Sequence, residues 1–164
     1  MPSPHMRAAF ASLLFLIAPV LPASADNHID GLILTVESAS NEPIFYTLAS
    51  FDDMAQTEIS TSNEFVSGLV TYSGPLAREL VAKVGGDPQS TVVLTATNDY
   101  QISVPAKDFF DYDVVLATRM DGEILSRRDK GPIWLMYPIS SHAELRDSSV
   151  NSKLIWQLVK MEVR

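Results

Sequence analysis

Short apolar and β-branched runs follow one another along most of the chain; some alternate with polar residues at the two-residue period of β-strands, and others are continuous. Short runs rich in β-branched and aromatic residues predict strands over 31–36, 44–48, 57–61, 66–72, 91–97, 100–104, 113–118, 133–137 and 155–163. In the last of these, Ile155, Val159, Met161 and Val163 should share one face. The polar stretches 38–43 and 62–64 predict loops, and Gly68 predicts a bulge.

Helical spacing is clear in one segment only. Leu76, Leu80, Val81 and Val84 follow Gly74-Pro75 at intervals that place them on one helical face, and Gly85-Gly86 should end that helix. Shorter helical turns are expected over 51–55, capped by Ser50, and over 107–111.

Two dipeptides predict tight turns between strands. Asp121-Gly122 suits a type I′ turn, which needs positive φ at both central residues, and Asn98-Asp99 offers a second turn. The whole pattern predicts a mixed α/β (α+β) domain built mostly from β hairpins with a few short helices.

Residues 1–25 have the three parts of a signal peptide. Arg7 supplies the basic start, residues 8–21 are apolar, and Ala23-Ser24-Ala25 is a cleavage site. The apolar part is too short and too interrupted by proline for a membrane span. We therefore expect a periplasmic or secreted protein, cleaved after Ala25, that is not membrane-embedded and whose residues 26–164 form a single domain.

Charge and cysteine content exclude several classes of function. The formal net charge is −8, which argues against binding to nucleic acid or to an anionic membrane surface. The sequence has no cysteine, so no thiolate can act as a nucleophile or as a soft metal ligand. His28 and His142 lie far apart without metal-binding spacing, and no pair of carboxylates stands out as acid and base. We therefore assign no catalytic residue and no metal ligand.

A cationic loop beside an aromatic strand is the main candidate for binding. Arg127, Arg128 and Lys130 precede Gly131-Pro132, which stops regular structure, and this run is either a solvated charged loop or a set of donors for a flat polar ligand. Trp134 lies in an apolar strand, which favours core packing.

Two further positions each allow two interpretations. Trp156, next to a polar glutamine, is either packed or the wall of a pocket. Asn98 and Asp99 are either turn formers or partners for the donor and acceptor edge of a heterocycle.

Six segments together resemble the small exported branch of the molybdopterin-binding oxidoreductase family, which has the sulfite oxidase fold. These are 48–54, 58–62, 71–76, 98–100 with 104–105, 128–132 with Trp134 and 137–138, and 155–158. The resemblance implies a sulfite-oxidase-type molybdopterin-binding fold with a pterin among loops at one end of the sheets. It implies ligand contacts from Arg128, Lys130, Trp156, Asn98, Asp99, Tyr100, Thr61, Ser62 and Trp134.

The chain departs from this family at the loop that would hold the metal. Family enzymes bind molybdenum through a cysteine thiolate in a loop that should align with 61–65, and this chain has none. Hydroxyl groups do not replace a soft thiolate donor. Small exported members also usually carry a proline-tryptophan pair where Glu64-Phe65 stands here. We therefore expect a pterin or molybdopterin-like ligand without a metal.

Three functions remain open at this point. Some members of the branch resemble periplasmic pterin-binding sensory proteins, which implies a non-catalytic module that relays ligand state to the periplasmic domain of a membrane-bound cyclic-di-GMP enzyme or another sensor. The alternatives are a molybdopterin-dependent oxidoreductase of the sulfite oxidase fold and a purely structural domain with a vestigial pocket.

Overall fold

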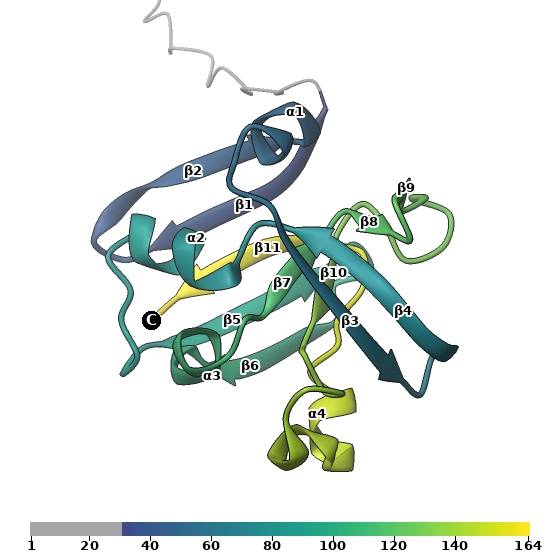
Figure 1. Cartoon of the computed structure of the whole chain (residues 1–164). Coiled ribbons are helices and arrows are strands. Elements are labelled where there is room, and N and C mark those ends of the chain that lie inside the picture. The colour runs from purple at the N-terminus through teal and green to yellow at the C-terminus, as the bar shows by residue number, and fades with distance from the viewer. Residues whose placement is uncertain (1–30) are drawn as a thin grey trace, which may run out of the picture.

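The structure is a computed structural model that describes residues 31–164, so the predicted signal peptide lies outside the described residues. Two sheets and a pair of central strands make up the domain (Figure 1). The five-stranded sheet has the order β2 (Asn41–Thr47), β1 (Leu32–Ser38), β11 (Leu158–Val163), β5 (Thr91–Ala96) and β6 (Gln101–Pro105). The four-stranded sheet has the order β3 (Thr57–Asn63), β4 (Val66–Gly74), β8 (Arg119–Met120) and β9 (Glu123–Ile124).

The helices are short and lie outside the sheets. They are α1 (Leu48–Asp52), α2 (Ala77–Lys83), α3 (Ala106–Asp111) and α4 (Ser148–Asn151), with a 3₁₀ turn at Ala143–Arg146. Within 31–164, no helix has the length and apolar character that a membrane crossing requires. Mixed sheets with few short helices confirm the predicted fold class.

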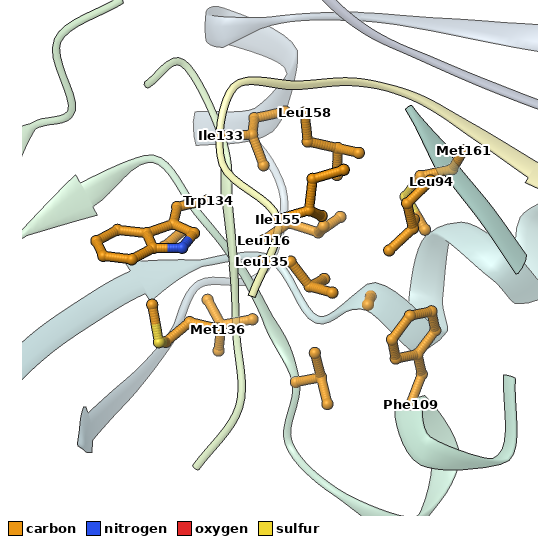
Figure 2. Close-up of a cluster of buried hydrophobic side chains, with 14 of the residues drawn as sticks. Leu94, Phe109, Leu116, Ile133, Trp134, Leu135, Met136, Ile155, Leu158 and Met161 are labelled. Carbon is orange, nitrogen blue, oxygen red and sulfur yellow. The ribbon is translucent and has the colours of Figure 1, made fainter. Parts of the chain in front are cut away.

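The two central strands form the middle of the core. β7 (Val115–Ala117) pairs with β10 (Trp134–Met136), and all their residues are buried. Side chains of β10 alternate: Leu135 points toward Leu94 of the five-stranded sheet, whereas Trp134 points to the opposite side (Figure 2). There its ring meets Tyr72 of β4, with ring centroids 5.5 Å apart. Both faces of β10 are therefore covered, which explains its unbroken apolar sequence.

Local signals of turns and breaks are confirmed by the backbone. Asp121 and Gly122 have φ of 49° and 82° and connect β8 to β9. Asp99 has φ of 63° in the turn between β5 and β6. Gly68 has φ of 86° at the point where the register of β3 and β4 shifts, as expected for a bulge. Gly85, with φ of 81°, follows α2.

The first helix begins earlier than the sequence predicted. Thr47, not Ser50, is the N-cap: its side chain accepts a hydrogen bond from the Ser50 amide at 3.2 Å, and the Ser50 hydroxyl accepts one from the Thr47 amide at 2.8 Å. This reciprocal capping box uses both hydroxyls, so Ser50 does take part in capping, but at position N3 instead of at the N-cap.

Three strand boundaries also differ from the prediction. β2 already begins at Asn41, because the β1–β2 connection is a two-residue turn instead of a loop over 38–43. The strand over 113–118 pairs with β10, and only Arg119–Met120 forms the hairpin arm before Asp121-Gly122. β11 begins at Leu158, its register with β5 shifts between Leu158 and Lys160, and Val159 is half-buried whereas Met161 is fully buried.

Candidate functional site

A cavity of about 340 Å³ lies where the β3–β4 turn, the β5–β6 turn and the segment before β11 meet. Its volume falls in the range of small-molecule pockets, about 300–1,000 Å³. Ten described residues line it: Phe65, Ala96, Asn98, Tyr100, Asn151, Ser152, Leu154, Ile155, Trp156 and Gln157. None of these side chains is charged, so the lining consists of aromatic rings, aliphatic groups, the hydroxyls of Ser152 and Tyr100, and amides.

Phe65 reaches the cavity because the β3–β4 turn is held in shape. The side-chain oxygen of Asn63 accepts hydrogen bonds from the amides of Phe65 and Val66 at 2.9 and 3.1 Å, which fixes a tight Asx-type turn. The Phe65 ring then stands edge-on to Trp156, with ring centroids 5.1 Å apart. An edge-to-face pair of this kind presents two fixed apolar surfaces to the cavity.

The wall over 154–156 is fixed by the buried central strand. The indole nitrogen of Trp134 donates to the carbonyl of Leu154 at 3.1 Å, and the amide of Leu135 donates to the carbonyl of Ile155 at 2.9 Å. Trp134 and Trp156 form an isolated bridge, so Trp156 is placed directly against the core while 39% of it stays exposed. Hydrogen bonds to the buried strand β10 thus fix the position of the cavity wall.

The side-chain amides that line the cavity differ in how many of their donors and acceptors already have a hydrogen-bond partner. Gln157 donates to the carbonyls of Arg127 and Asp129, and its side-chain oxygen accepts from the hydroxyl of Thr97. Asn98 uses its oxygen to accept from the Tyr100 amide at 3.2 Å. Within the described residues, the nitrogen of Asn98 and the whole side-chain amide of Asn151 have no hydrogen-bond partner. These groups are free to pair with a ligand.

Lys130 is a cation that contacts the aromatic wall of this site. Its ammonium lies 5.3 Å from the ring centre of Trp134 and 5.5 Å from that of Trp156, within cation–π range. It also lies 3.4 Å from a carboxylate oxygen of Asp129. Lys130 therefore supports the rings of the wall without lining the cavity itself.

A second polar cluster holds the segment that carries Asn151. Asp108 of α3 accepts from the Lys153 ammonium at 2.7 Å and from the Tyr137 hydroxyl at 3.1 Å. Burial raises the pKa of Tyr137 and Asp108 raises it further, so the phenol stays protonated and keeps donating at neutral pH. The cluster ties the chain just before Leu154 to α3.

The predicted site residues are partly brought together. Asn98, Tyr100 and Trp156 line the cavity, and Lys130 contacts Trp156. The others lie outside the lining: Asp99 in the β5–β6 turn, Arg128 exposed on the cationic loop, Trp134 fully buried behind the wall, and Thr61 and Ser62 on β3.

Sequence reasoning missed the remaining lining residues. Phe65 could have been predicted, because an aromatic ring in a polar turn is unusual and indicates a packing or ligand contact. Asn151 could not, since it lies in a four-residue helix that is too short to show periodicity.

Comparison with known proteins gives the family. The sequence profile described as "Oxidoreductase molybdopterin binding domain" matches residues 23–143, most of the chain. The chain belongs to this family. No characterised protein with a curated description matches it by sequence.

A solved structure shows the same fold. The sulfane dehydrogenase SoxCD from Paracoccus pantotrophus superposes with a TM-score of 0.59 at 15% sequence identity. The match covers 79% of this chain but 37% of the SoxCD chain, so this protein spans little more than a third of that relative's length. At this identity the likeness shows the sulfite-oxidase-type fold of the molybdopterin-binding family and nothing more about activity.

The donor groups of this family member do not fit a thiolate-bound molybdenum. The chain has no cysteine. Where the resemblance places the family's metal-binding loop, the hydroxyls of Thr61 and Ser62 are instead bonded within the protein: the Thr61 oxygen accepts from the Ser140 amide at 3.1 Å, and the Ser62 and Ser140 hydroxyls lie 3.2 Å apart. Thr61 is also fully buried. Among the described residues, no cluster of three His, Cys, Asp or Glu could hold a metal ion.

Proposed function

We propose that this protein is a non-catalytic binding module for a pterin-like molecule, and that it reports the state of its ligand to a protein partner. The observation that carries the proposal is the cavity itself: aromatic walls from Phe65 and Trp156 stand beside the free amides of Asn98 and Asn151. Family membership supports a pterin-type ligand.

The chemistry of the lining suits a flat heterocycle with an amide-like edge. A pterin ring presents neighbouring N–H donors and a carbonyl acceptor, which an asparagine amide can pair with two hydrogen bonds. Its faces can stack on or against indole and phenyl rings. The lining has no carboxylate, histidine or thiolate, so the Ser152 hydroxyl and the Tyr100 phenol have no general base beside them in the lining that would activate them.

The location and partner belong to the same proposal. The signal-peptide pattern over residues 1–25 supports export to the periplasm. A binding module that catalyses no reaction acts when its ligand changes its affinity for a protein partner. A membrane-bound enzyme of cyclic-di-GMP signalling with a periplasmic domain is the partner that the family resemblance supports.

Calorimetric titration with a reduced pterin tests the binding. We would use tetrahydrobiopterin as the probe, with wild type, Trp156→Ala and, as a matched control, Phe45→Ala, an aromatic on β2 that is 46% exposed against 39% for Trp156 and does not line the cavity. Stacking on an aromatic side chain contributes about 1–3 kcal/mol, so Trp156→Ala should weaken binding about five- to hundredfold and Phe45→Ala should not. Equal affinity in all three proteins would contradict the proposal.

A molybdopterin-dependent oxidoreductase is the second candidate, because the family match supports it as well. The two candidates differ in their metal content. Elemental analysis of protein purified from the periplasm should find no stoichiometric molybdenum, and mass spectrometry of released small molecules should find a pterin. About one molybdenum per chain, with turnover of a sulfite-like substrate, would establish the enzyme instead.

A further inference from the structure

Gln157 connects the cavity to the cationic loop over 126–131 through both its backbone and its side chain. Its amide donates to the Lys130 carbonyl at 3.0 Å, and its side-chain nitrogen donates to the carbonyls of Arg127 and Asp129 at 3.2 and 2.9 Å. Three carbonyls of one short loop therefore accept from a single residue that also lines the cavity.

The same residue is also fixed to the β5–β6 turn. The Gln157 carbonyl accepts from the Thr97 amide at 3.0 Å, and its side-chain oxygen accepts from the Thr97 hydroxyl at 3.0 Å. Gln157 adopts a left-handed backbone with φ of 52°, which a non-glycine residue takes only at some cost. Such a conformation persists where surrounding contacts hold it, and it is often found at binding sites.

The loop itself has few other contacts to hold it. Its internal backbone bonds return to Ser126: the amides of Asp129 and Gly131 donate to the Ser126 carbonyl, and the amide of Arg128 donates to the Ser126 hydroxyl. The Lys130 ammonium also donates to a carboxylate oxygen of Asp129 at 3.4 Å. The Lys130 ammonium rests over Trp156, the neighbour of Gln157. The loop is therefore attached to the rest of the domain mainly through the cavity wall and by one hydrogen bond from the Arg127 guanidinium to the Leu32 carbonyl of β1 at 3.4 Å, while the side chain of Arg128 faces solvent.

We propose that Gln157 is a positioning residue that couples occupancy of the cavity to the order of the cationic loop. This inference rests on the proposed function and specifies its regulation. A ligand seated against Trp156 and Gln157 favours the arrangement in which Gln157 is in place, because that arrangement offers the ligand more contacts. The same arrangement holds the loop carbonyls, so ligand binding orders the loop that carries Arg127 and Arg128.

Hydrogen–deuterium exchange of the peptide covering 126–131 measures this coupling. The test compares wild type, Gln157→Ala and Gln157→Gly, each with and without tetrahydrobiopterin at a saturating concentration set by calorimetry. Gln157→Gly relieves the left-handed backbone, so it separates the loss of the side chain from backbone strain. Gln101→Ala is the matched control, because the Gln101 amide bonds to Thr95 within the β5–β6 hairpin and does not reach the loop.

In the ligand-free proteins we expect the loop to exchange about tenfold faster in both Gln157 variants than in wild type and Gln101→Ala. The pterin should slow exchange in wild type by about fivefold or more, within the usual range of coupling between sites, and should have little effect in the variants. Wild-type loop exchange that ignores a bound pterin, or pterin-dependent protection that survives in Gln157→Ala, would overturn the coupling while leaving the proposed function intact. Absence of any pterin binding would overturn both.

Discussion

Replacing Trp134 by phenylalanine tests whether the wall of the cavity depends on the core. Trp134 is fully buried, and its indole nitrogen donates to the carbonyl of Leu154, itself only 2% exposed. Phenylalanine cannot make this bond, so the carbonyl loses the one partner recorded for it within the described residues. The smaller ring also leaves space next to Tyr72.

The expected loss of stability combines these two effects. Leaving a buried acceptor without a partner costs about 1–3 kcal/mol. Truncation of a large buried ring adds about 1–2 kcal/mol, less than the loss for complete removal to alanine. We expect Trp134→Phe to lower the free energy of unfolding by about 3 kcal/mol. For a domain of this size, that lowers the melting temperature by about 10 °C.

Trp156→Phe is the matched control for this measurement. Trp156 is 39% exposed and, among the described residues, its indole nitrogen has no recorded hydrogen bond, so the same substitution should cost less than about 1 kcal/mol. Urea unfolding followed by far-UV circular dichroism gives both free energies, and equal slopes against denaturant show that unfolding stays comparable. A loss below about 1 kcal/mol for Trp134→Phe, or equal losses for the two variants, would refute the reasoning.

Three further predictions follow from the cationic loop, the leader and an ion pair. Lys130→Met should weaken binding of a reduced pterin in calorimetry more than Arg128→Ala, because Lys130 lies over Trp156 whereas Arg128 is exposed; equal losses would mean that the Arg128 guanidinium reaches the ligand. Residues 1–30 fused to a reporter that works only outside the cytoplasm should give activity, and a silent reporter would reject the signal peptide. The bidentate hydrogen bond from Arg119 lowers the pKa of Asp52 below that of an ordinary aspartate, so the stability advantage of wild type over Arg119→Met, measured by thermal melts, should be present above pH 5 and decline as the pH falls through that lowered pKa; an advantage that does not decline at all on acidification would contradict this.

The parts of the fold that were predictable depend on neighbours in sequence. A turn at Asp121-Gly122 needs only two residues that tolerate positive φ, and α2 needs only helical spacing followed by Gly85. The pairing of β1 with β11 is different. It joins Thr35 to Lys160 in parallel across most of the chain, and no local pattern encodes which distant strand lies alongside. The strand order of the sheets therefore had to come from the structure.

The site was harder to predict than the fold because it is assembled from three distant turns whose side chains must face one way. In a strand, a shift of one residue turns every side chain to the other face. The register of β11 shifts between Leu158 and Lys160, and Trp156 lies before the strand in an isolated bridge, so spacing alone could not say whether Trp156 faced the core or the cavity. Charge drew attention to Arg128, whereas the cavity is lined by rings and amides. This contrast has a physical cause. A charged side chain is easily solvated on an open loop, whereas a cavity that binds the uncharged edge of a heterocycle needs uncharged hydrogen-bond donors and acceptors, because burying a charge is costly. The residue that joins the cationic loop to the cavity is therefore the uncharged Gln157, which donates to two loop carbonyls and lines the cavity.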